Sequence, residues 1–108
     1  MIVSIEIEPG NYLPSHWDSN EELLVVTGGR VTATIDDETV DLHAGQCAVV
    51  PEIEPHELRN DGDETASIIG FFPGTELTAT FDDVLQPFGT AEVTLGSAPA
   101  EDRQERTD

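Results

Sequence analysis

The 108-residue sequence predicts a single all-β domain, built as a sandwich or a small barrel. Two observations favour strands: apolar and polar residues alternate with a period of two, and turn residues recur roughly every 8–12 residues. A third argues against helices, because no window of about 11 residues carries the apolar stripe of an amphipathic helix. Short strands in a chain of this length fit either architecture, and alternation alone does not choose between them.

The first half of the chain holds the clearest strand patterns. IVSIEIE (2–8) alternates strictly and stops at the Pro9-Gly10 turn signal. Further strands are expected at 23–27 before Gly28-Gly29, at 31–35 and 39–42 on either side of the acidic tip 36–38, and at 47–50 before Pro51. In the last of these, Cys47 alternates with Val49, and we expect it to be a small buried residue.

The second half continues the β pattern and then loses it. A short strand within 56–60 precedes the polar turn NDGDE, and SIIGFF (67–72) is the most apolar run, expected deep in the core. Further strands are expected at 77–81 and 91–95. Apolar periodicity ends after residue 96, so we expect a domain over 1–96 and a flexible acidic tail over 97–108.

Charge is the most extreme property of the chain. It has 23 Asp and Glu against four Lys and Arg, a formal net charge of −19, and all four basic residues are arginine. This balance argues against nucleic acid and anionic membranes as partners. The acids are spread through the strand segments, unlike a disordered tail or a tight cation-binding cluster, so we interpret them as adaptation to high salt. One cysteine excludes an intrachain disulfide, and with no signal-like or membrane-spanning apolar segment we expect a cytoplasmic protein.

Two segments resemble the paired motifs of the cupin superfamily. The first motif runs Gly, five residues, His, one residue, His, three or four residues, Glu, six residues, Gly, and it matches Gly10, His16, Asp18, Glu22 and Gly29. The second runs Gly, five residues, Pro, one residue, Gly, two residues, His, three residues, Asn, and it matches Gly45, Pro51, Ile53, His56 and Asn60. The resemblance covers residues 10–60. It implies a small single-domain cupin, a double-stranded β-helix or jelly-roll barrel.

The sequence departs from the motifs at two positions. Asp18 stands where the second histidine is usual, and Ile53 replaces the glycine after Pro51. A β-branched residue takes a positive φ only at a cost, so we expect the loop before His56 to differ from the family's loop. Asp18 is either a ligand in place of histidine or the mark of a site that has lost its metal.

The motif residues also make chemical sense as a metal site. His16 and Asp18 are two apart on an extended segment, so their side chains leave the same face, and Glu22 follows a short polar turn. Two imidazoles with carboxylates suit Fe, Mn, Zn or Ni better than Ca. We therefore expect a divalent transition metal held by His16, Asp18, Glu22 and His56. For the carboxylates, solvated acidic surface is the alternative, since Glu21 adjoins Glu22.

Other polar residues carry weaker signals. Arg59 is a candidate for binding an acidic group of a substrate, with a structural salt bridge as the alternative. His43 lies outside both motifs, and we expect it to be exposed. Trp17 is expected to point away from its two neighbours on the extended segment.

The function these residues indicate is a metal-binding barrel with a small-molecule ligand. The resemblance implies oxygenase or isomerase chemistry without ranking the two, and no catalytic residue beyond the metal set is indicated. A His-x-Asp pair with a distant His also spells the facial triad of non-haem Fe(II) oxygenases, although the 2-oxoglutarate-dependent kind usually has a longer chain. The alternatives are a non-catalytic ligand-binding or sensory barrel with a degenerate metal site, and a purely structural protein. We also expect a homodimer that pairs through the edge strand at 2–8.

Overall fold

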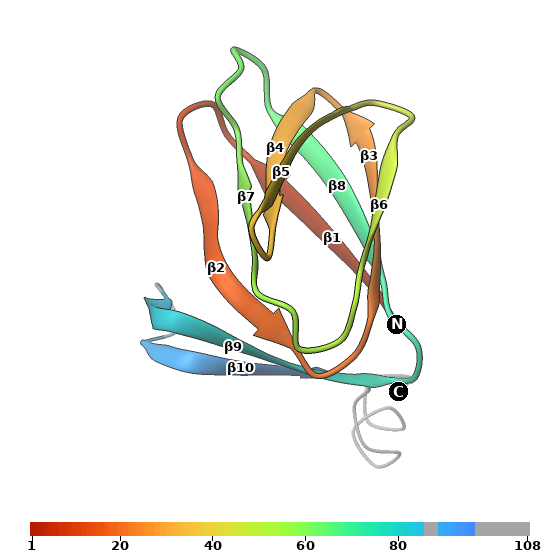
Figure 1. Ribbon diagram of the computed structural model, residues 1–108, viewed down its shortest axis with the longest axis vertical. Coiled ribbons are helices and arrows are strands. Elements are labelled where there is room, and N and C mark those ends of the chain that lie inside the picture. Colours follow the sequence, from red (N-terminus) through yellow and green to blue (C-terminus); the bar gives the residue numbers. More distant parts are fainter. Residues whose placement is uncertain (86–88, 97–108) are drawn as a thin grey trace, which may run out of the picture.

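The computed structural model describes residues 1–85 and 89–96, which form ten β-strands and, within those ranges, no helix (Figure 1). No helix among the described residues is therefore able to cross a membrane. The strands are β1 (Ile2–Ile7), β2 (Tyr12–Asp18), β3 (Glu22–Gly28), β4 (Arg30–Ile35), β5 (Glu38–His43), β6 (Cys47–Val50), β7 (His56–Arg59), β8 (Ala66–Phe71), β9 (Glu76–Leu85) and β10 (Thr90–Gly96). The expected tail, 97–108, lies outside the described residues.

The strands form two antiparallel sheets arranged as a jelly-roll barrel (Figure 1). One sheet has the order β1-β8-β3-β6, and the other has the order β10-β9-β2-β7-β4-β5. Strands that are neighbours in space are mostly distant in sequence, so that β2 and β7, for example, lie side by side. This crossing topology brings the two motif segments, 10–29 and 45–60, against each other.

Alternation of side chains fills the space between the sheets. On β3, Leu24 and Val26 are buried while Leu23 is exposed, and on β8 Ala66 and Ile68 face inward in the same way. The core cluster consists of Ile7, Leu24, Val26, Val31, Ala33, Leu42, Val50, Leu58, Ala66 and Ile68. Most of it comes from the period-two segments of the sequence.

The expected strands are confirmed with shifts of a few residues at their ends, and β2 is added to them. β1 lies at the free edge of the four-stranded sheet, where we placed an edge strand. The homodimer through that edge stays a prediction. His43 is exposed, and Trp17 is 38% exposed between two buried neighbours, both as expected.

One expectation about burial was wrong, and a second holds for only one face of its strand. Cys47 is exposed, because Cys47 and Val49 lie on the outer side of β6 while Val50 faces the core. SIIGFF is buried only in part: Ile68 faces inward, and Phe71 is 40% exposed on the outer side. A period of two identifies the two faces of a strand but does not say which face is the inner one.

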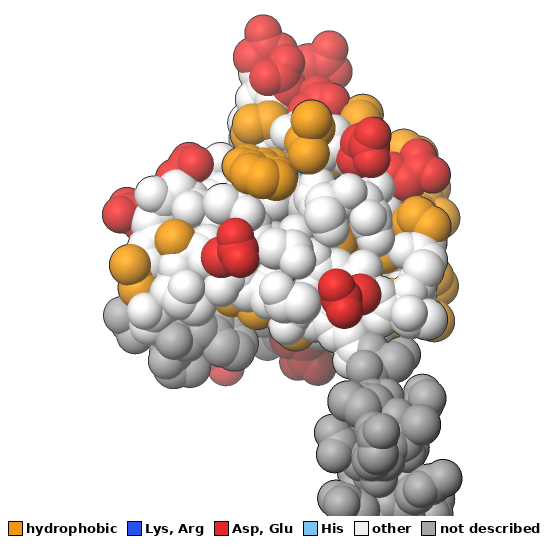
Figure 2. Space-filling view, turned by 90° about the horizontal axis from the view of Figure 1, so that it is seen from below, with side chains coloured by type: hydrophobic (Ala, Val, Ile, Leu, Met, Phe, Trp, Pro, Cys, Tyr) orange, Lys and Arg blue, Asp and Glu red, His pale blue; other side chains and the backbone are white. Residues whose placement is uncertain are grey.

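The acidic residues are dispersed over the surface. Figure 2 shows the face seen from below, where several separate red carboxylates lie among orange and white surface and others gather at its upper edge, and no Lys or Arg of the described residues is visible on it. The dispersal agrees with the sequence, in which acids occur in every part of the chain.

Candidate metal centre

The four candidate ligands come from three strands and meet inside the barrel. His16 and Asp18 leave the same face of β2, and His56, the first residue of β7, pairs directly with His16 across the strands. Glu22 is the first residue of β3 and reaches the group from the opposite sheet. All four are buried, with exposed fractions of 5% for His16, 4% for Asp18, 3% for Glu22 and 1% for His56. Residues from separate segments of the sequence thus lie together in one buried cluster.

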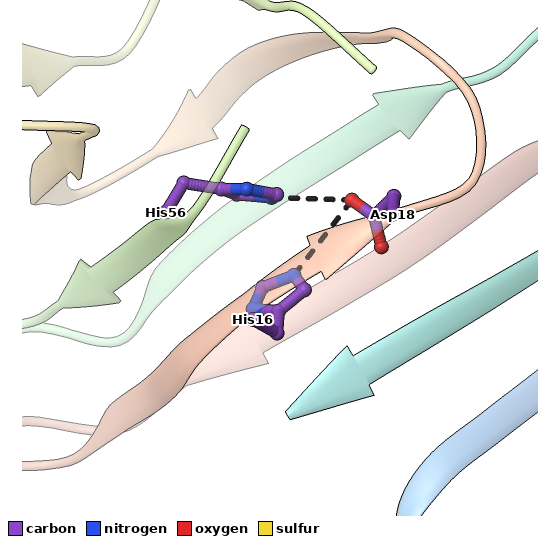
Figure 3. Close-up of side chains that lie close together, drawn as sticks. All are labelled: His16, Asp18 and His56. Carbon is purple, nitrogen blue, oxygen red and sulfur yellow. Dashed lines mark ion pairs between the residues drawn. The ribbon is translucent and has the colours of Figure 1, made fainter. Parts of the chain in front are cut away.

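The side chains of the cluster approach one another through their ligand atoms. Figure 3 shows His16, Asp18 and His56 turned toward a common point. Asp18 Oδ2 lies 3.2 Å from His56 Nε2 and 3.8 Å from His16 Nε2. Glu22 Oε1 lies 3.3 Å from His56 Nε2. One atom from each of His16, Asp18 and His56 can be chosen so that all three lie within 4.8 Å of one another.

Both imidazoles are oriented by the backbone. His16 Nδ1 donates a hydrogen bond of 2.9 Å to the carbonyl of Pro14, and His56 Nδ1 donates one of 2.9 Å to the carbonyl of Glu54. A carbonyl can only accept, so each Nδ1 carries the proton and each Nε2 of a neutral ring presents its lone pair to the cluster. Histidines that bind metals are commonly fixed by such a bond at the other ring nitrogen.

The Nε2 atom of His56 is buried without a well-directed hydrogen bond. The carboxylate oxygens of Asp18 and Glu22 are at 3.2 and 3.3 Å, but neither makes a hydrogen bond of good geometry with this nitrogen. Two ligands bound to one ion at about 2.1 Å and roughly 90–110° apart are about 3.0–3.5 Å from each other. The two separations at His56 fall in this range, and the 3.8 Å between Asp18 Oδ2 and His16 Nε2 is slightly longer. His16, Asp18 and His56 therefore fit a shared divalent cation, and Glu22 adjoins this set through His56.

Burial and mutual charge shift the titration of the cluster. For His56, burial acts to lower the pKa, but the carboxylates of Asp18 and Glu22 outweigh it and raise the pKa to about 10. Burial lowers the pKa of His16, and the neighbouring His56 lowers it further. Burial raises the pKa of Glu22 above its ordinary value. Without a cation, a proton on His56 offsets part of the negative charge of the two carboxylates.

Two residues outside the motif shape the cluster, and our sequence reasoning missed both. Gly70 on β8 leaves room for Glu22, because a Cβ at this position would collide with Glu22 Oε2. The Phe81 ring stacks on His16 with centroids 4.6 Å apart. An isolated glycine within the apolar run SIIGFF is itself a signal of close approach and could have identified Gly70.

The loop before His56 corrects one expectation. Ile53 adopts a φ of +54°, so it takes the left-handed conformation that we expected a β-branched residue to avoid. It is the third residue of a turn in which Glu54 N–H donates to Pro51 O, the position where glycine is favoured in type II turns. The Ile53 amide donates a hydrogen bond of 2.9 Å to Asp18 O. The loop therefore keeps the conformation that suits glycine and connects the two motifs through their backbones.

A cavity of about 210 Å³ opens onto the cluster. His16, Asp18, Glu22 and His56 are its polar lining residues, and the remaining nine are apolar. Arg59 does not line this cavity: its guanidinium lies 4.6 Å from the centre of the Tyr12 ring and 3.6 Å from Glu57 Oε1. The structure thus puts the sequence-predicted ligands in the cavity and places Arg59 elsewhere.

Comparison with known proteins adds family information. The Cupin domain family model matches residues 3–72. Polyketide synthase CurC from Streptomyces cyaneus is 34% identical over 64 residues, which are 58% of this chain and 42% of that protein. The chain therefore spans less than half the length of this curated relative.

Two solved structures extend the comparison. A candidate sugar phosphate isomerase from Acidithiobacillus ferrooxidans has 27% identity and a TM-score of 0.58, over 74% of this chain and 54% of that one. A sugar phosphate isomerase of the cupin superfamily from Silicibacter pomeroyi has 20% identity and a TM-score of 0.62, over 93% of this chain and 71% of that one. The second similarity concerns the fold alone.

Proposed function

This chain belongs to the cupin family, and from that premise we propose that its barrel binds one divalent transition metal together with a small-molecule ligand. The proposed ligands of the metal are His16, Asp18, Glu22 and His56. The observation that carries the proposal is the orientation of the two histidines. Each donates Nδ1–H to a backbone carbonyl, which turns both Nε2 atoms toward buried carboxylates.

The protein's own residues would perform three tasks in this function. Pro14 O and Glu54 O hold the imidazoles in the ligating tautomer. Asp18 and Glu22 supply the charge that balances a cation, and the apolar cavity walls exclude water beside it. A bound metal with free coordination positions would supply polarisation of a ligand oxygen, which both isomerase and oxygenase chemistry can use.

A second candidate function is a ligand-binding barrel without metal. The observation that favours it is the raised pKa of His56, which is shifted to about 10. A protonated His56 between Asp18 and Glu22 compensates much of the buried charge, so the cluster has a stable form with no cation. Metal content separates the two functions, and turnover or oxygen consumption by metal-loaded protein would then separate an enzyme from a binding protein.

The test is the metal content of untagged protein purified in high salt, measured by mass spectrometry. The variants are His16→Ala and His56→Ala, with His43→Ala as the matched control because His43 is exposed and lies outside the cluster. We expect near-stoichiometric transition metal in the wild type and in His43→Ala, and its loss in the other two. Equal trace metal in all four proteins would overturn the proposal, since acidic surface retains cations unspecifically.

A further inference from the structure

The walls of the cavity indicate the class of ligand that enters it. Besides the four candidate metal ligands, its nine lining residues are all aliphatic or aromatic, and they include Leu58, Phe72 and Phe81, each buried. None of the described residues that line the cavity is Lys or Arg. A molecule bound there would have its body against hydrocarbon and could meet polar groups only at the cluster.

No arginine of the described residues lies where it could pair with an anionic ligand in this cavity. The two arginines in the described ranges lie elsewhere: Arg30 is exposed beside Gly62, and Arg59 lies over Tyr12. A divalent ion would be balanced by two carboxylates, Asp18 and Glu22, which leaves no net positive charge for a phosphate or a carboxylate of a ligand. Burying an uncompensated anion is unfavourable, and the surrounding net charge of −19 adds to the repulsion.

The volume of the cavity indicates how large a group it can hold. At about 30 Å³ per water molecule, 210 Å³ corresponds to about seven waters, below the roughly 300–1,000 Å³ of pockets that hold drug-sized molecules. A single substituted ring or a short branched chain fits this space. Phe72 and Phe81 offer aromatic faces to such a body.

We propose that the cavity binds a small uncharged carbonyl or hydroxyl compound with an apolar body, its oxygen directed to the metal, and that it rejects phosphorylated sugars and carboxylates. One part of this inference rests on the proposed function: the ligand oxygen is directed to a metal only if the barrel binds one. Rejection of anions rests on the walls and the two carboxylates, so it holds for the metal-free protein as well.

The test compares acetophenone with benzoate, two probes with the same number of non-hydrogen atoms and different charge, and includes fructose 6-phosphate. Binding to the full chain is measured by ligand-detected NMR titration, with and without added Mn(II), and bound metal is measured on the same samples. We expect acetophenone to bind at least about tenfold more tightly than benzoate, and fructose 6-phosphate to show no binding. Equal or tighter binding of either anion, or no binding of acetophenone, would overturn the inference.

A charge variant tests the reason for the preference. Val93 lines the cavity and is half-buried on the edge strand β10, so Val93→Lys places a cation at the cavity without removing a core side chain. We expect Val93→Lys to lower the ratio of the benzoate dissociation constant to the acetophenone dissociation constant by at least about tenfold. Val84→Lys, at an exposed site outside the cavity, should leave this ratio unchanged. An unchanged ratio in Val93→Lys contradicts the charge argument.

The metal content of the samples separates failure of this inference from failure of the proposed function. A sample that binds no metal and still prefers acetophenone refutes the proposed function alone. A metal-loaded sample that prefers benzoate refutes this inference alone.

Discussion

Metal binding should release a proton from His56. The carboxylates of Asp18 and Glu22 hold its pKa near 10, so at neutral pH the metal-free ring carries a proton on Nε2, the atom that would bind the metal. His16 needs no such exchange, because its pKa is lowered and it is already neutral. Binding of one ion is therefore coupled to the loss of one proton from His56.

The pH dependence of the apparent metal affinity distinguishes a raised pKa at His56 from the ordinary pKa of a histidine. With a pKa near 10, each unit of pH from about 6.5 to 8.5 raises the apparent metal affinity about tenfold, or about hundredfold in all. A histidine at the ordinary pKa of about 6.5 would give only about a twofold change over the same range.

The assay is calorimetric titration of Mn(II) into the metal-free protein in molar KCl. Two buffers with different ionisation enthalpies give the number of protons released, and a series of pH values gives the slope. His43→Ala should behave as the wild type does. A change of about twofold with no released proton would refute the reasoning that the carboxylates hold a proton on His56.

The same shift sets how the metal-free protein responds to alkali. Since the folded pKa of His56 lies above its unfolded value, its contribution to the free energy of unfolding is fully present below about pH 6.5 and is lost as the pH rises through about 10. The thermal midpoint of metal-free protein should fall over that interval. His56→Ala should lose this component of the pH dependence, and a midpoint that rises toward pH 10 would contradict the assignment.

Further predictions concern the supports of the cluster and the charge of the surface. Gly70→Ala should lower Mn(II) affinity by about tenfold or more in the same titration, because the new Cβ displaces Glu22, whereas Gly28→Ala adds only ordinary contacts and should not. Ile53→Gly should raise the free energy of unfolding by about 1 kcal/mol, and the thermal midpoint by about 4 °C, because it relieves a positive φ. Asn60→Ala should cost about 2–4 kcal/mol in denaturant unfolding, since the buried amide donates to two carbonyls and accepts from the Gly62 N–H. Raising KCl from about 0.1 M to 1 M shortens the screening length from about 10 Å to 3 Å, so the thermal midpoint should rise by at least about 5 °C. A salt-independent midpoint would contradict the interpretation of the acidic surface as salt adaptation.

Most of the strands could be predicted from the sequence, because alternation and turn residues are local patterns. Alternation in IVSIEIE and VTATI identified β1 and β4, and Pro51 marked the end of β6. The resemblance to the cupin motifs pointed to His16, Asp18, Glu22 and His56, and all four side chains line one cavity of the structure. Their role as metal ligands stays a prediction. These features depend on neighbours in sequence or on a pattern that a known family shares.

What the sequence could not give depends on contacts between distant segments. The exposed face of Cys47 follows from which side of β6 meets the core. Room for Glu22 depends on Gly70, 48 residues later in the chain, and on the way β8 lies beside β3. The positive φ of Ile53 is imposed by its turn and by its bond to Asp18, and this tertiary demand outweighs the local preference of a β-branched residue.

The most direct test of a metal centre is a crystal of the full chain grown with Mn(II), with anomalous diffraction to locate the ion. The account predicts one dominant peak inside the barrel, bonded to Nε2 of both His16 and His56 and to oxygens of Asp18 and Glu22. The peak should be absent in crystals of His56→Ala. Peaks confined to surface carboxylates, with His56 still beside Asp18 and Glu22, would contradict the account and leave a barrel in which a proton on His56 offsets part of the buried charge.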